Sequence, residues 1–313
     1  MNNIPFLSEQ DLTHLNITTD DVIRSIEETI RGGENGRVWS APKAVIMPPG
    51  DGRYMMAALA AMDEPSYLAV KTVVLNPSNP DSGLAQINGL VTMLHSDTGL
   101  PAAILDGNWI TAVRTAGLSA VAAKYLANPG AESVGFIGCG VQAQSHLRAF
   151  AQMFPLRRIK LFGRGRPNQE KLLATAAELG LTAELCDSGQ QAISDVDLVV
   201  TSITVTGGAE PFLDASGLKP GAFATITDFG VPWHKSTFSA LDVLAIDDVE
   251  QEAAMPNKLC DASLIDGDLS GLVLGKLSGR SSVSQRTAFL FRGHALGDLA
   301  LSSLALETYL GNR

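Results

Sequence analysis

A strand-like run followed by a glycine-rich turn constrains this chain more than any other feature: VGFIGCGVQAQSH, residues 134–146. Gly138, Gly140 and Ala143 form a G-x-G-x-x-A arrangement directly after the apolar run. The first glycine allows a tight turn, the second lets the backbone approach a pyrophosphate, and the small third residue lets a helix pack closely on the strand. Because helix N-termini bind phosphate, the stretch predicts a dinucleotide-binding strand–turn–helix unit.

The residues after this turn alternate between strands and helices. A helical run through QSHLRAFAQM leads to the strand RIKLFGR, and NQEKLLATAAELG is a second helical run. Further buried strands are expected in DLVVTSIT, AFATITDFG and VLAIDD. Alternation at this spacing is typical of βαβ units and a parallel sheet. The sequence therefore predicts an α/β fold with a Rossmann dinucleotide-binding domain over residues 126–286.

The end of the second strand of this unit bears on which nucleotide is bound. Sites for NAD usually carry Asp or Glu about 20 residues past the motif, where it binds the ribose 2′-hydroxyl. This strand ends LFGRGRP, with Arg164 and Arg166 and no acidic residue nearby. Arginine suits a 2′-phosphate through charge-assisted contacts, which favours NADP(H). If both arginines are simply solvated surface residues, NAD(H) remains the alternative.

The first part of the chain has a different pattern. Its helical runs start at Ser8 and at Thr18, both expected caps, and the second is expected to stop at Gly32 and Gly33. Short apolar strands follow one another between turns: KAVIMP, YMMAALAAM, YLAVKTVVL, GLVTMLHSD and LPAAILDG. They predict a mainly antiparallel or mixed sheet. NWITAVRTAGLSAVAAKYLANPG reads as a buried helix, and TAFLFRGHALGDLALSSLALETYL as one long apolar helix.

Composition excludes several classes of protein. The 313 residues exceed what one core usually carries, so two domains are expected. A net charge of −10 argues against a nucleic-acid partner. Three cysteines without C-x-x-C spacing, and scattered histidines, predict no disulfide framework and no metal site. With neither a secretory signal nor a membrane-length apolar run expected, we predict a cytoplasmic protein with no membrane partner.

Two adjoining motifs suggest a family. DGNWITAVRTAGLSAVAAKYL, followed by VGFIGCGVQAQSH, resembles the ornithine cyclodeaminase/mu-crystallin family. The lysine in LAVKTVVL and the G-x-A-x-x-D pattern within RGHALGDLA extend the resemblance over nearly the whole chain. It implies a homodimer in which residues 1–125 and 287–313 form a discontinuous α+β substrate-binding and dimerisation domain. Members include cyclodeaminases, ketimine and cyclic-imine reductases, and amino-acid dehydrogenases.

Carried over residue by residue, Lys71 and Arg114 match the family's cations for the substrate carboxylate. Each is also a lone charge in an apolar stretch, and buried Lys or Arg needs an anionic partner. An internal salt bridge, for example with Asp106, is the alternative. The residues predicted to contact the nucleotide are Thr115, Gly138, Gly140, Val141, Gln142, Ala143, Arg164, Ser202, Asp228 and Gly293.

The chain also departs from the family pattern. Lys43 stands where the family often has Arg, so a planar bidentate contact is lost. Asp228 lies in the loop that carries the catalytic Asp of cyclodeaminases, but Gly230 aligns with that Asp, so Asp228 is either an acid/base or a turn cap. His294, usually apolar in the family, is a proton donor or a packed helix-start histidine. Met56 is assigned to the substrate pocket, with a core position as the alternative.

These residues predict an NADPH-dependent reductase of a small ketimine or cyclic-imine carboxylate, such as pyrroline-2-carboxylate. Lys43, Lys71 and Arg114 would hold the carboxylate while hydride adds to the C=N carbon. Lys71, Asp228 and His294 are the predicted catalytic residues. A cyclodeaminase using catalytic NAD+, an amino-acid dehydrogenase, and a non-catalytic nucleotide-binding protein remain the alternatives.

Overall fold

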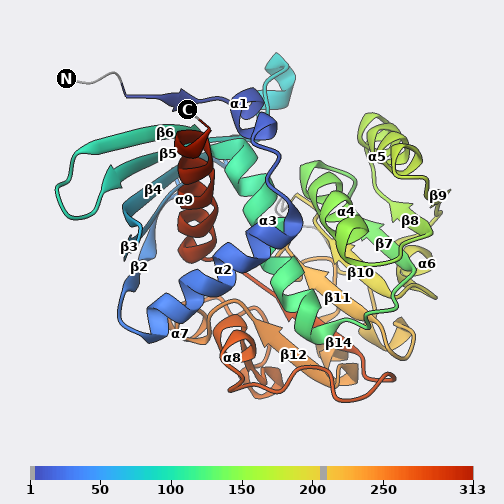
Figure 1. The fold of residues 1–313 in the computed structure, drawn as a ribbon. Helices are drawn as coiled ribbons and strands as arrows, with labels where there is room; N and C mark the ends of the chain where they lie inside the picture. Colours follow the sequence, from blue (N-terminus) through green and yellow to red (C-terminus); the bar gives the residue numbers. More distant parts are fainter. Residues whose placement is uncertain (1–3, 205–209, 313) are drawn as a thin grey trace. The chain divides into compact units, whose positions relative to one another are not determined.

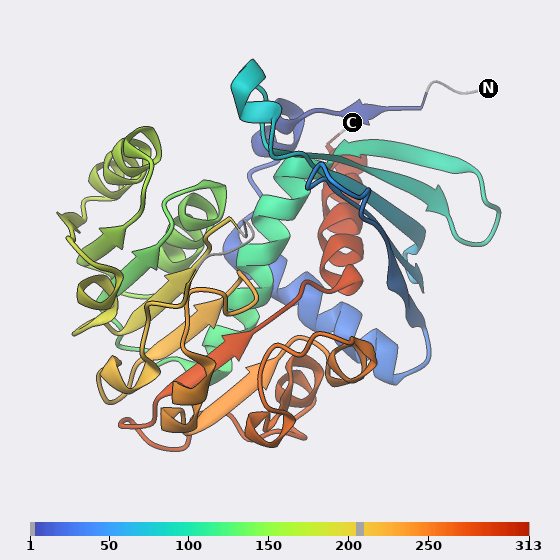
Figure 2. The ribbon, with the colours of Figure 1, turned by 180° about the vertical axis from the view of Figure 1, so that it is seen from behind.

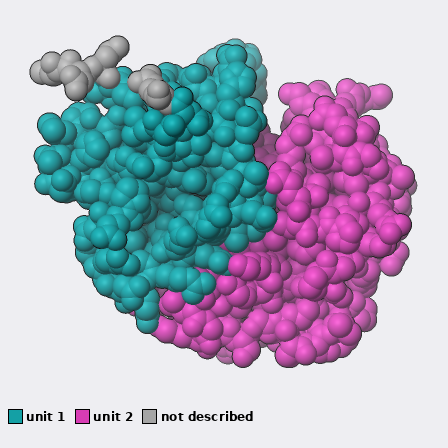
Figure 3. Space-filling view, viewed as in Figure 1, with its two compact units in different colours: residues 1–114, 295–313 teal, residues 115–294 magenta. Residues whose placement is uncertain are grey.

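Residues 4–204 and 210–312 are described by a computed structural model of the chain. The chain divides into a first unit, residues 1–114 with 295–313, and a second unit, residues 115–294 (Figure 3). Each unit has a sheet of its own. Within the described part of the chain, no helix combines the length and apolar character needed to span a bilayer.

The first unit is built on a six-stranded mixed sheet (Figure 2). The spatial order is β1-β6-β5-β4-β3-β2, in which β1 runs parallel to β6 and every other neighbouring pair is antiparallel. This confirms the predicted sheet type. The strands are β1 (Phe6–Leu7), β2 (Val38–Ile46), β3 (Tyr54–Asp63), β4 (Ser66–Leu75), β5 (Ile87–His95) and β6 (Pro101–Asp106).

One face of this sheet is covered by helices (Figure 1). Helix α9 (Ala295–Gly311) packs on β2, β3 and β4, and α2 (Thr19–Glu34) packs on α9. In β4 the buried residues alternate as Tyr67, Ala69, Lys71 and Val73, so all four share one face of the strand. The charged Lys71 therefore lies in a row of core positions.

The N-terminal helices begin as the sequence predicts. Ser8 and Thr18 each form a capping box, at the starts of α1 (Glu9–His14) and of α2. The predicted stop of α2 at Gly32 and Gly33 is wrong, because the helix continues to Glu34 and the left-handed residue that ends it is Gly36, with φ 68°. Two glycines lower helix propensity but do not by themselves end a helix.

The second unit contains an eight-stranded, all-parallel sheet of order β13-β12-β14-β11-β10-β7-β8-β9. The chain runs from β7 outward to β9, then returns to add β10 on the other side of β7. This reversal is the topological switch point beside which open α/β sheets bind nucleotides, and it confirms the predicted Rossmann architecture. The strands are β7 (Ser133–Ile137), β8 (Arg158–Phe162), β9 (Thr182–Leu185), β10 (Leu198–Thr201), β11 (Phe223–Ile226), β12 (Val243–Ile246), β13 (Gly267–Asp268) and β14 (Thr287–Leu290).

Several central strands of this sheet are buried along their whole length, which explains why they read as continuous apolar runs instead of alternating patterns. The α-helices that follow or flank them are α3 (Gly107–Leu126), α4 (Val141–Met153), α5 (Arg166–Glu178), α6 (Gly189–Ile193), α7 (Val249–Ala254) and α8 (Leu269–Val273). Short 3-10 turns are η1 (Asn79–Ser82), η2 (Ala215–Gly217), η3 (Lys235–Ala240) and η4 (Ala262–Leu264).

The C-terminal segment differs from the single helix expected from residue 287. Residues Thr287–Leu290 form β14, inserted between β11 and β12, and α9 begins only at Ala295. The buried run TAFL pairs on both sides in a parallel sheet, and periodicity cannot distinguish such a run from a buried helix.

The division into units also lies away from the predicted domain boundaries, after 125 and before 287. The first unit ends at Arg114 and resumes at Ala295. The second half of α3 belongs to the second unit because Ser119 hydrogen-bonds Thr225 of β11, at 2.8 Å between the hydroxyl oxygens. The role of the first unit in substrate binding and dimerisation stays a prediction.

Candidate functional site

The turn after β7 requires glycine for a steric reason. Gly138 has φ 88°, and a Cβ added there would lie 2.7 Å from the carbonyl oxygen of Ser202. Ser202 follows β10, the neighbour of β7 across the switch point. The first glycine of the motif therefore lets the turns after these two strands approach each other.

The second glycine of the motif, Gly140, borders open space. Gly140 precedes α4 as its N-cap, without a side-chain cap, and a Cβ added to it would have no neighbour within 4 Å. The backbone N–H groups of Val141 and Gln142 occupy the first helical turn, where no carbonyl of the helix is available to them. Ala143, the small third residue of the motif, is fully buried. An open turn at the N-terminus of a helix suits a pyrophosphate, so these residues fit the predicted nucleotide.

The two arginines after β8 differ in their surroundings. Arg166 pairs with Glu170 one helical turn later, with Nε 2.9 Å from Oε1. Arg164 is exposed, and within the described residues its guanidinium has no ion-pair partner. Of the pair, Arg164 is therefore the arginine available to a ligand.

Asp228, in the loop after β11, is 2% exposed. Its carboxylate accepts hydrogen bonds from the Thr201 hydroxyl at 2.9 Å and from the Ile203 backbone N–H at 3.1 Å. Burial raises the pKa of Asp228 to about 6, against the lowering effect of these donors. The carboxylate joins the loops after β10 and β11, as expected of a residue that caps a turn. Its pKa also suits proton transfer near neutral pH, so the acid/base role remains open as well.

Ser202 and Thr115 are two further predicted nucleotide contacts in the second unit. The Ser202 hydroxyl oxygen is buried and has no hydrogen-bond partner among the described residues. Thr115 is 5% exposed on α3. A buried hydroxyl without a partner is unfavourable unless a ligand or water satisfies it, so Ser202 fits a position beside the nucleotide.

His294 and Gly293 end the second unit. The His294 imidazole Nε2 lies 2.9 Å from an oxygen of Asp248, the residue that caps α7. Gly293 has φ 93°, and its carbonyl accepts a hydrogen bond from Gln251 at 3.4 Å. His294 is thus oriented by a carboxylate, as a proton-donating histidine commonly is, but the same contact also anchors the start of α7.

A buried charge cluster occupies the first unit. Its members are Lys71 on β4, Arg114 on α3 and Asp298 on α9. The Lys71 Nζ lies 2.6 Å from Asp298 Oδ1, and the Arg114 Nε lies 3.0 Å from the same oxygen. The side chains are 1%, 9% and 5% exposed, respectively. The structure therefore brings together the two cations that the sequence assigned to a substrate carboxylate.

The charges in this cluster perturb one another. Burial, with the Arg114 charge added to it, lowers the pKa of Lys71 to about 7, although Asp298 opposes the shift. Burial alone would raise the pKa of Asp298, but Arg114 and Lys71 hold it below its ordinary value. The positive charge of Lys43 lowers the pKa of both Lys71 and Asp298. A cluster with more cations than carboxylates has capacity for a second anion.

The Arg114 guanidinium shows this unused capacity directly. Its Nη1 is buried and has no hydrogen-bond partner within residues 4–204 and 210–312, and its Nε contact with Asp298 lacks hydrogen-bond geometry. Lys43 lies in β2 where the pairing with β3 shifts between Ala41 and Ala44. Met56 pairs with Val73, which alternates with Lys71 on the buried face of β4. Buried guanidinium donors without partners fit an incoming carboxylate.

The alternative interpretation of these cations is partly right. Lys71 and Arg114 do have an internal carboxylate partner, but it is Asp298 and not Asp106. Asp106 instead accepts the Trp109 backbone N–H at 2.8 Å, at the start of α3. Asp298 was missed as a site residue, although RGHALGDLA contains it as the one carboxylate in the apolar first half of α9.

His146 was also missed. It is fully buried on α4 and hydrogen-bonded on both ring nitrogens. The sequence feature that could have identified it is its position in VQAQSH, on the helix that begins at the glycine motif.

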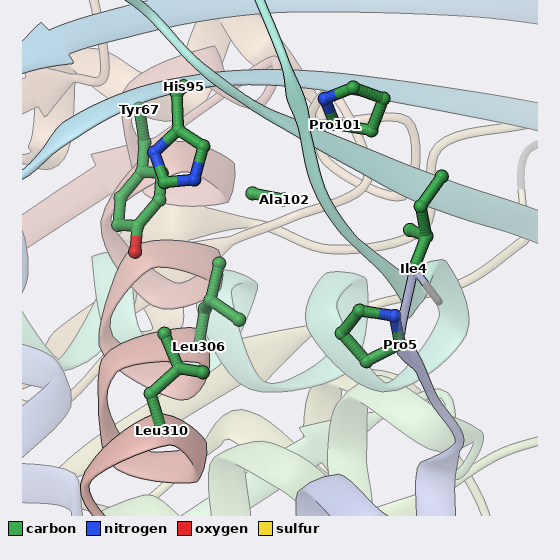
Figure 4. Close-up of a pocket in the computed structure, with 8 residues that line it drawn as sticks. All are labelled: Ile4, Pro5, Tyr67, His95, Pro101, Ala102, Leu306 and Leu310. Carbon is green, nitrogen blue, oxygen red and sulfur yellow. The ribbon is translucent and has the colours of Figure 1, made fainter. Parts of the chain in front are cut away.

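A separate cavity of about 210 Å³ lies in the first unit (Figure 4). Beside it, the Tyr67 hydroxyl donates to Glu307 at 2.5 Å, and the Tyr67 and His95 rings lie 5.6 Å apart. It is lined by Ile4, Pro5, Tyr67, His95, Pro101, Ala102, Leu306 and Leu310. None of the residues that the sequence assigned to a site is among them.

The chain is similar to known proteins over most of its length. The chain is 26% identical to an alanine dehydrogenase of Archaeoglobus fulgidus, in an alignment that covers 97% of this chain and 94% of the relative. It is 28% identical to the ketimine reductase mu-crystallin of Rattus norvegicus, over 82% and 80% of the two chains. The structure of a Thermococcus litoralis Delta(1)-pyrroline-2-carboxylate reductase in complex with NADH and L-proline superposes with a TM-score of 0.90, at 25% identity, covering 99% and 98% of the chains.

A family model matches nearly the whole chain, residues 5–312. The match includes the glycine turn of the second unit and all three members of the buried charge cluster. The chain belongs to the ornithine cyclodeaminase/mu-crystallin family.

Proposed function

We propose that this protein is an NAD(P)H-dependent reductase of a small ketimine or cyclic-imine carboxylate, such as pyrroline-2-carboxylate. The observation that carries the proposal is the buried Arg114 guanidinium, which lies beside Lys71 and one carboxylate and has donors without a partner in the described part of the chain. Relatives named as a ketimine reductase and as a pyrroline-2-carboxylate reductase act on substrates of this class. This is oxidoreductase chemistry on a C=N bond.

In this proposal the charge cluster binds the substrate. Arg114 donates to the substrate carboxylate, Lys71 and Lys43 add positive charge, and Met56 contacts its apolar part. Asp298 holds Lys71 and Arg114 in place through the contacts described above. Fixing the carboxylate orients the C=N carbon, and orientation of this kind lowers the entropic part of the barrier.

The proposed chemistry adds a hydride and a proton across the C=N bond, so that an imine becomes an amine. When bound, the reduced nicotinamide supplies the hydride to carbon. Asp228 or His294 donates the proton to nitrogen, with Lys71, whose pKa is about 7, as a further source. The nucleotide is held by the backbone of Val141 and Gln142, with the other predicted contacts around it.

An amino-acid dehydrogenase is the second candidate, favoured by the full-length similarity to an alanine dehydrogenase. It would form its imine from a 2-oxo acid and ammonia with loss of water, and then reduce the C=N bond. A cyclodeaminase is disfavoured because Gly230 stands where that mechanism places an aspartate. A binding protein without catalysis is the minority alternative, and the absence of turnover with every candidate substrate would favour it.

The proposal is tested by following nucleotide absorbance with candidate substrates. We expect oxidation of NADPH or NADH with pyrroline-2-carboxylate or its six-membered homologue. Reaction only with a 2-oxo acid plus ammonia would select the dehydrogenase, and ammonia released from ornithine or lysine would select the cyclodeaminase. Absence of turnover in all three assays would overturn the enzymatic proposal.

We further propose that Arg164 gives a preference for NADPH over NADH. Its exposed guanidinium suits the 2′-phosphate. Arg164→Ala should lower kcat/KM for NADPH by about 10-fold or more and leave kcat/KM for NADH nearly unchanged. Arg166→Ala, which removes an arginine already paired with Glu170, is the matched control. A wild-type preference for NADH would contradict this cofactor assignment.

We propose that a second copy of the chain covers the outer face of the six-stranded sheet. Trp39, Leu59, Val74 and Leu90 share this face, opposite Lys71, and are 50%, 40%, 40% and 44% exposed. An apolar face of this kind marks an interface more often than free surface. Light scattering should give twice the 33.0 kDa of one chain, and Val74→Asp should lower that mass. A monomeric wild type would contradict the homodimer.

We propose that the protein is cytoplasmic, and the state of its thiols is consistent with this location. Cys139, Cys186 and Cys260 are all buried and form no disulfide, as suits a reducing compartment.

A further inference from the structure

A chain of buried hydrogen bonds lies beneath the glycine motif in the second unit. The His146 Nδ1 lies 2.7 Å from the backbone carbonyl oxygen of Gln142, and its Nε2 lies 2.8 Å from the Ser119 hydroxyl. The Ser119 oxygen in turn lies 2.8 Å from the hydroxyl of Thr225. All three side chains are fully buried, and the Phe150 ring packs edge-on against the imidazole at 5.9 Å.

The partners determine where each proton lies. A carbonyl oxygen only accepts, so the His146 Nδ1 must carry the proton that it donates to Gln142. The neutral ring then accepts at Nε2, which requires the Ser119 hydroxyl to donate to it. Thr225 must therefore donate to Ser119. Burial lowers the pKa of His146 to about 4, so the imidazole is neutral at physiological pH and the direction of the chain is maintained.

Each helix or strand joined by these hydrogen bonds carries, or leads directly to, a predicted nucleotide contact (the elements are labelled in Figure 1). Gln142 is in the first turn of α4, whose N-terminus would face the pyrophosphate. Ser119 lies one helical turn after Thr115 on α3, so both side chains are on the same side of that helix. Thr225 is in β11, which ends just before Asp228.

We infer that His146 is a positioning residue for nucleotide binding, which holds the first turn of α4 in register with α3 and β11. The inference rests on the proposed nucleotide-dependent function and assigns His146 a role within it. His146 does not touch the nucleotide in this proposal; it acts through the backbone that does.

Loss of this residue should weaken nucleotide binding specifically. His146→Leu keeps a buried side chain of similar size but leaves the Ser119 hydroxyl and the Gln142 carbonyl without the imidazole. Removing one partner from a buried hydrogen bond is costly, and here the loss falls on the turn that binds phosphate. We expect the Kd for the preferred nucleotide to rise by about tenfold.

The conservative variant His146→Gln provides a rescue. The Gln amide oxygen can occupy nearly the place of Nε2 and accept from the Ser119 hydroxyl, which keeps the link between α4 and α3. We expect His146→Gln to recover most of the affinity. Ser119→Ala removes the same link and should weaken binding about as much as His146→Leu.

Arg280→Leu is the matched control for general destabilisation of the second unit. Arg280 donates to the backbone carbonyls of Leu126 and Gln285, at 2.8 and 2.6 Å, and so anchors the far end of α3. It should lower Tm at least as much as His146→Leu while changing the nucleotide Kd by less than about twofold.

The experiment measures Tm without ligand, nucleotide Kd by fluorescence titration, and KM for nucleotide and imine separately. In His146→Leu we expect the nucleotide KM to rise while kcat at saturating nucleotide stays close to wild type. Equal Kd in His146→Leu and Arg280→Leu, or no rescue by His146→Gln, would overturn this inference alone. A wild-type chain that binds neither NADH nor NADPH would overturn the proposed function and this inference with it.

Discussion

Arg114→Ala is expected to lower kcat/KM for an imine carboxylate by about 10³-fold while leaving the nucleotide Kd unchanged. The guanidinium is buried, and its Nη1 has no hydrogen-bond partner among the described residues, so a substrate carboxylate would be its strongest available contact. Removing one member of a buried charge pair that forms on binding leaves the other charge without compensation. Steady-state kinetics with a saturating nucleotide measure the loss.

Two further variants separate charge from geometry. Arg114→Lys keeps the charge but not the planar fork, so we expect an intermediate loss of about 10- to 100-fold. Arg37→Ala is the control, because Arg37 belongs to the first unit and its side chain pairs with Glu64 at the surface. Wild-type kcat/KM in Arg114→Ala would show that Arg114 has a structural role alone.

Asp298→Ala is expected to give the largest loss of stability, about 3–5 kcal/mol in the free energy of unfolding. Asp298 is the carboxylate that both Lys71 and Arg114 approach, at 2.6 and 3.0 Å, and all three are buried. Without it the buried cations repel each other with no opposite charge between them. Denaturant unfolding of the variant and the wild type measures the difference, with Glu64→Gln, an exposed carboxylate, as control.

The stability difference should also depend on pH. In the wild type the pKa of Lys71 is about 7, and Asp298 is one of the groups that raise it. Removing Asp298 therefore lowers the pKa of Lys71 further, so the folded variant binds fewer protons than the folded wild type just below pH 7. Stability falls with decreasing pH wherever the unfolded state binds more protons than the folded state. This condition extends to lower pH in the variant than in the wild type, so the difference in unfolding free energy between the two should widen from pH 8 to pH 6. A constant difference would contradict the coupling between Lys71 and Asp298.

Local signals in the sequence predicted much of the fold. The caps at Ser8 and Thr18, the apolar strands and the glycine turn at Gly138 each depend on residues close together in the chain, and each appears in the structure. The start of α9 was wrong because β14 is a short apolar run, and burial on both faces removes the alternation that distinguishes a strand.

The residues of the candidate site were also predicted only in part. Lys71 and Arg114 could be selected from the sequence because charges are rare in apolar segments. Their partner could not, since Asp298 lies 227 positions from Lys71 and several other carboxylates were equally plausible. His146 was missed because its role depends on Ser119 and Thr225, which lie on other elements.

The sequence by itself determined the dinucleotide-binding architecture, the family and the two cations of the proposed substrate site. Those follow from short motifs, whose backbone demands and charges are local properties. Only the tertiary structure decided that Asp298 pairs with both cations. It also decided that, among the residues it describes, Arg114 keeps an unused donor and Arg164, unlike Arg166, has no ion-pair partner. Such contacts depend on how sheet and helices pack, because a buried charge is stabilised by whichever partner packing places within reach.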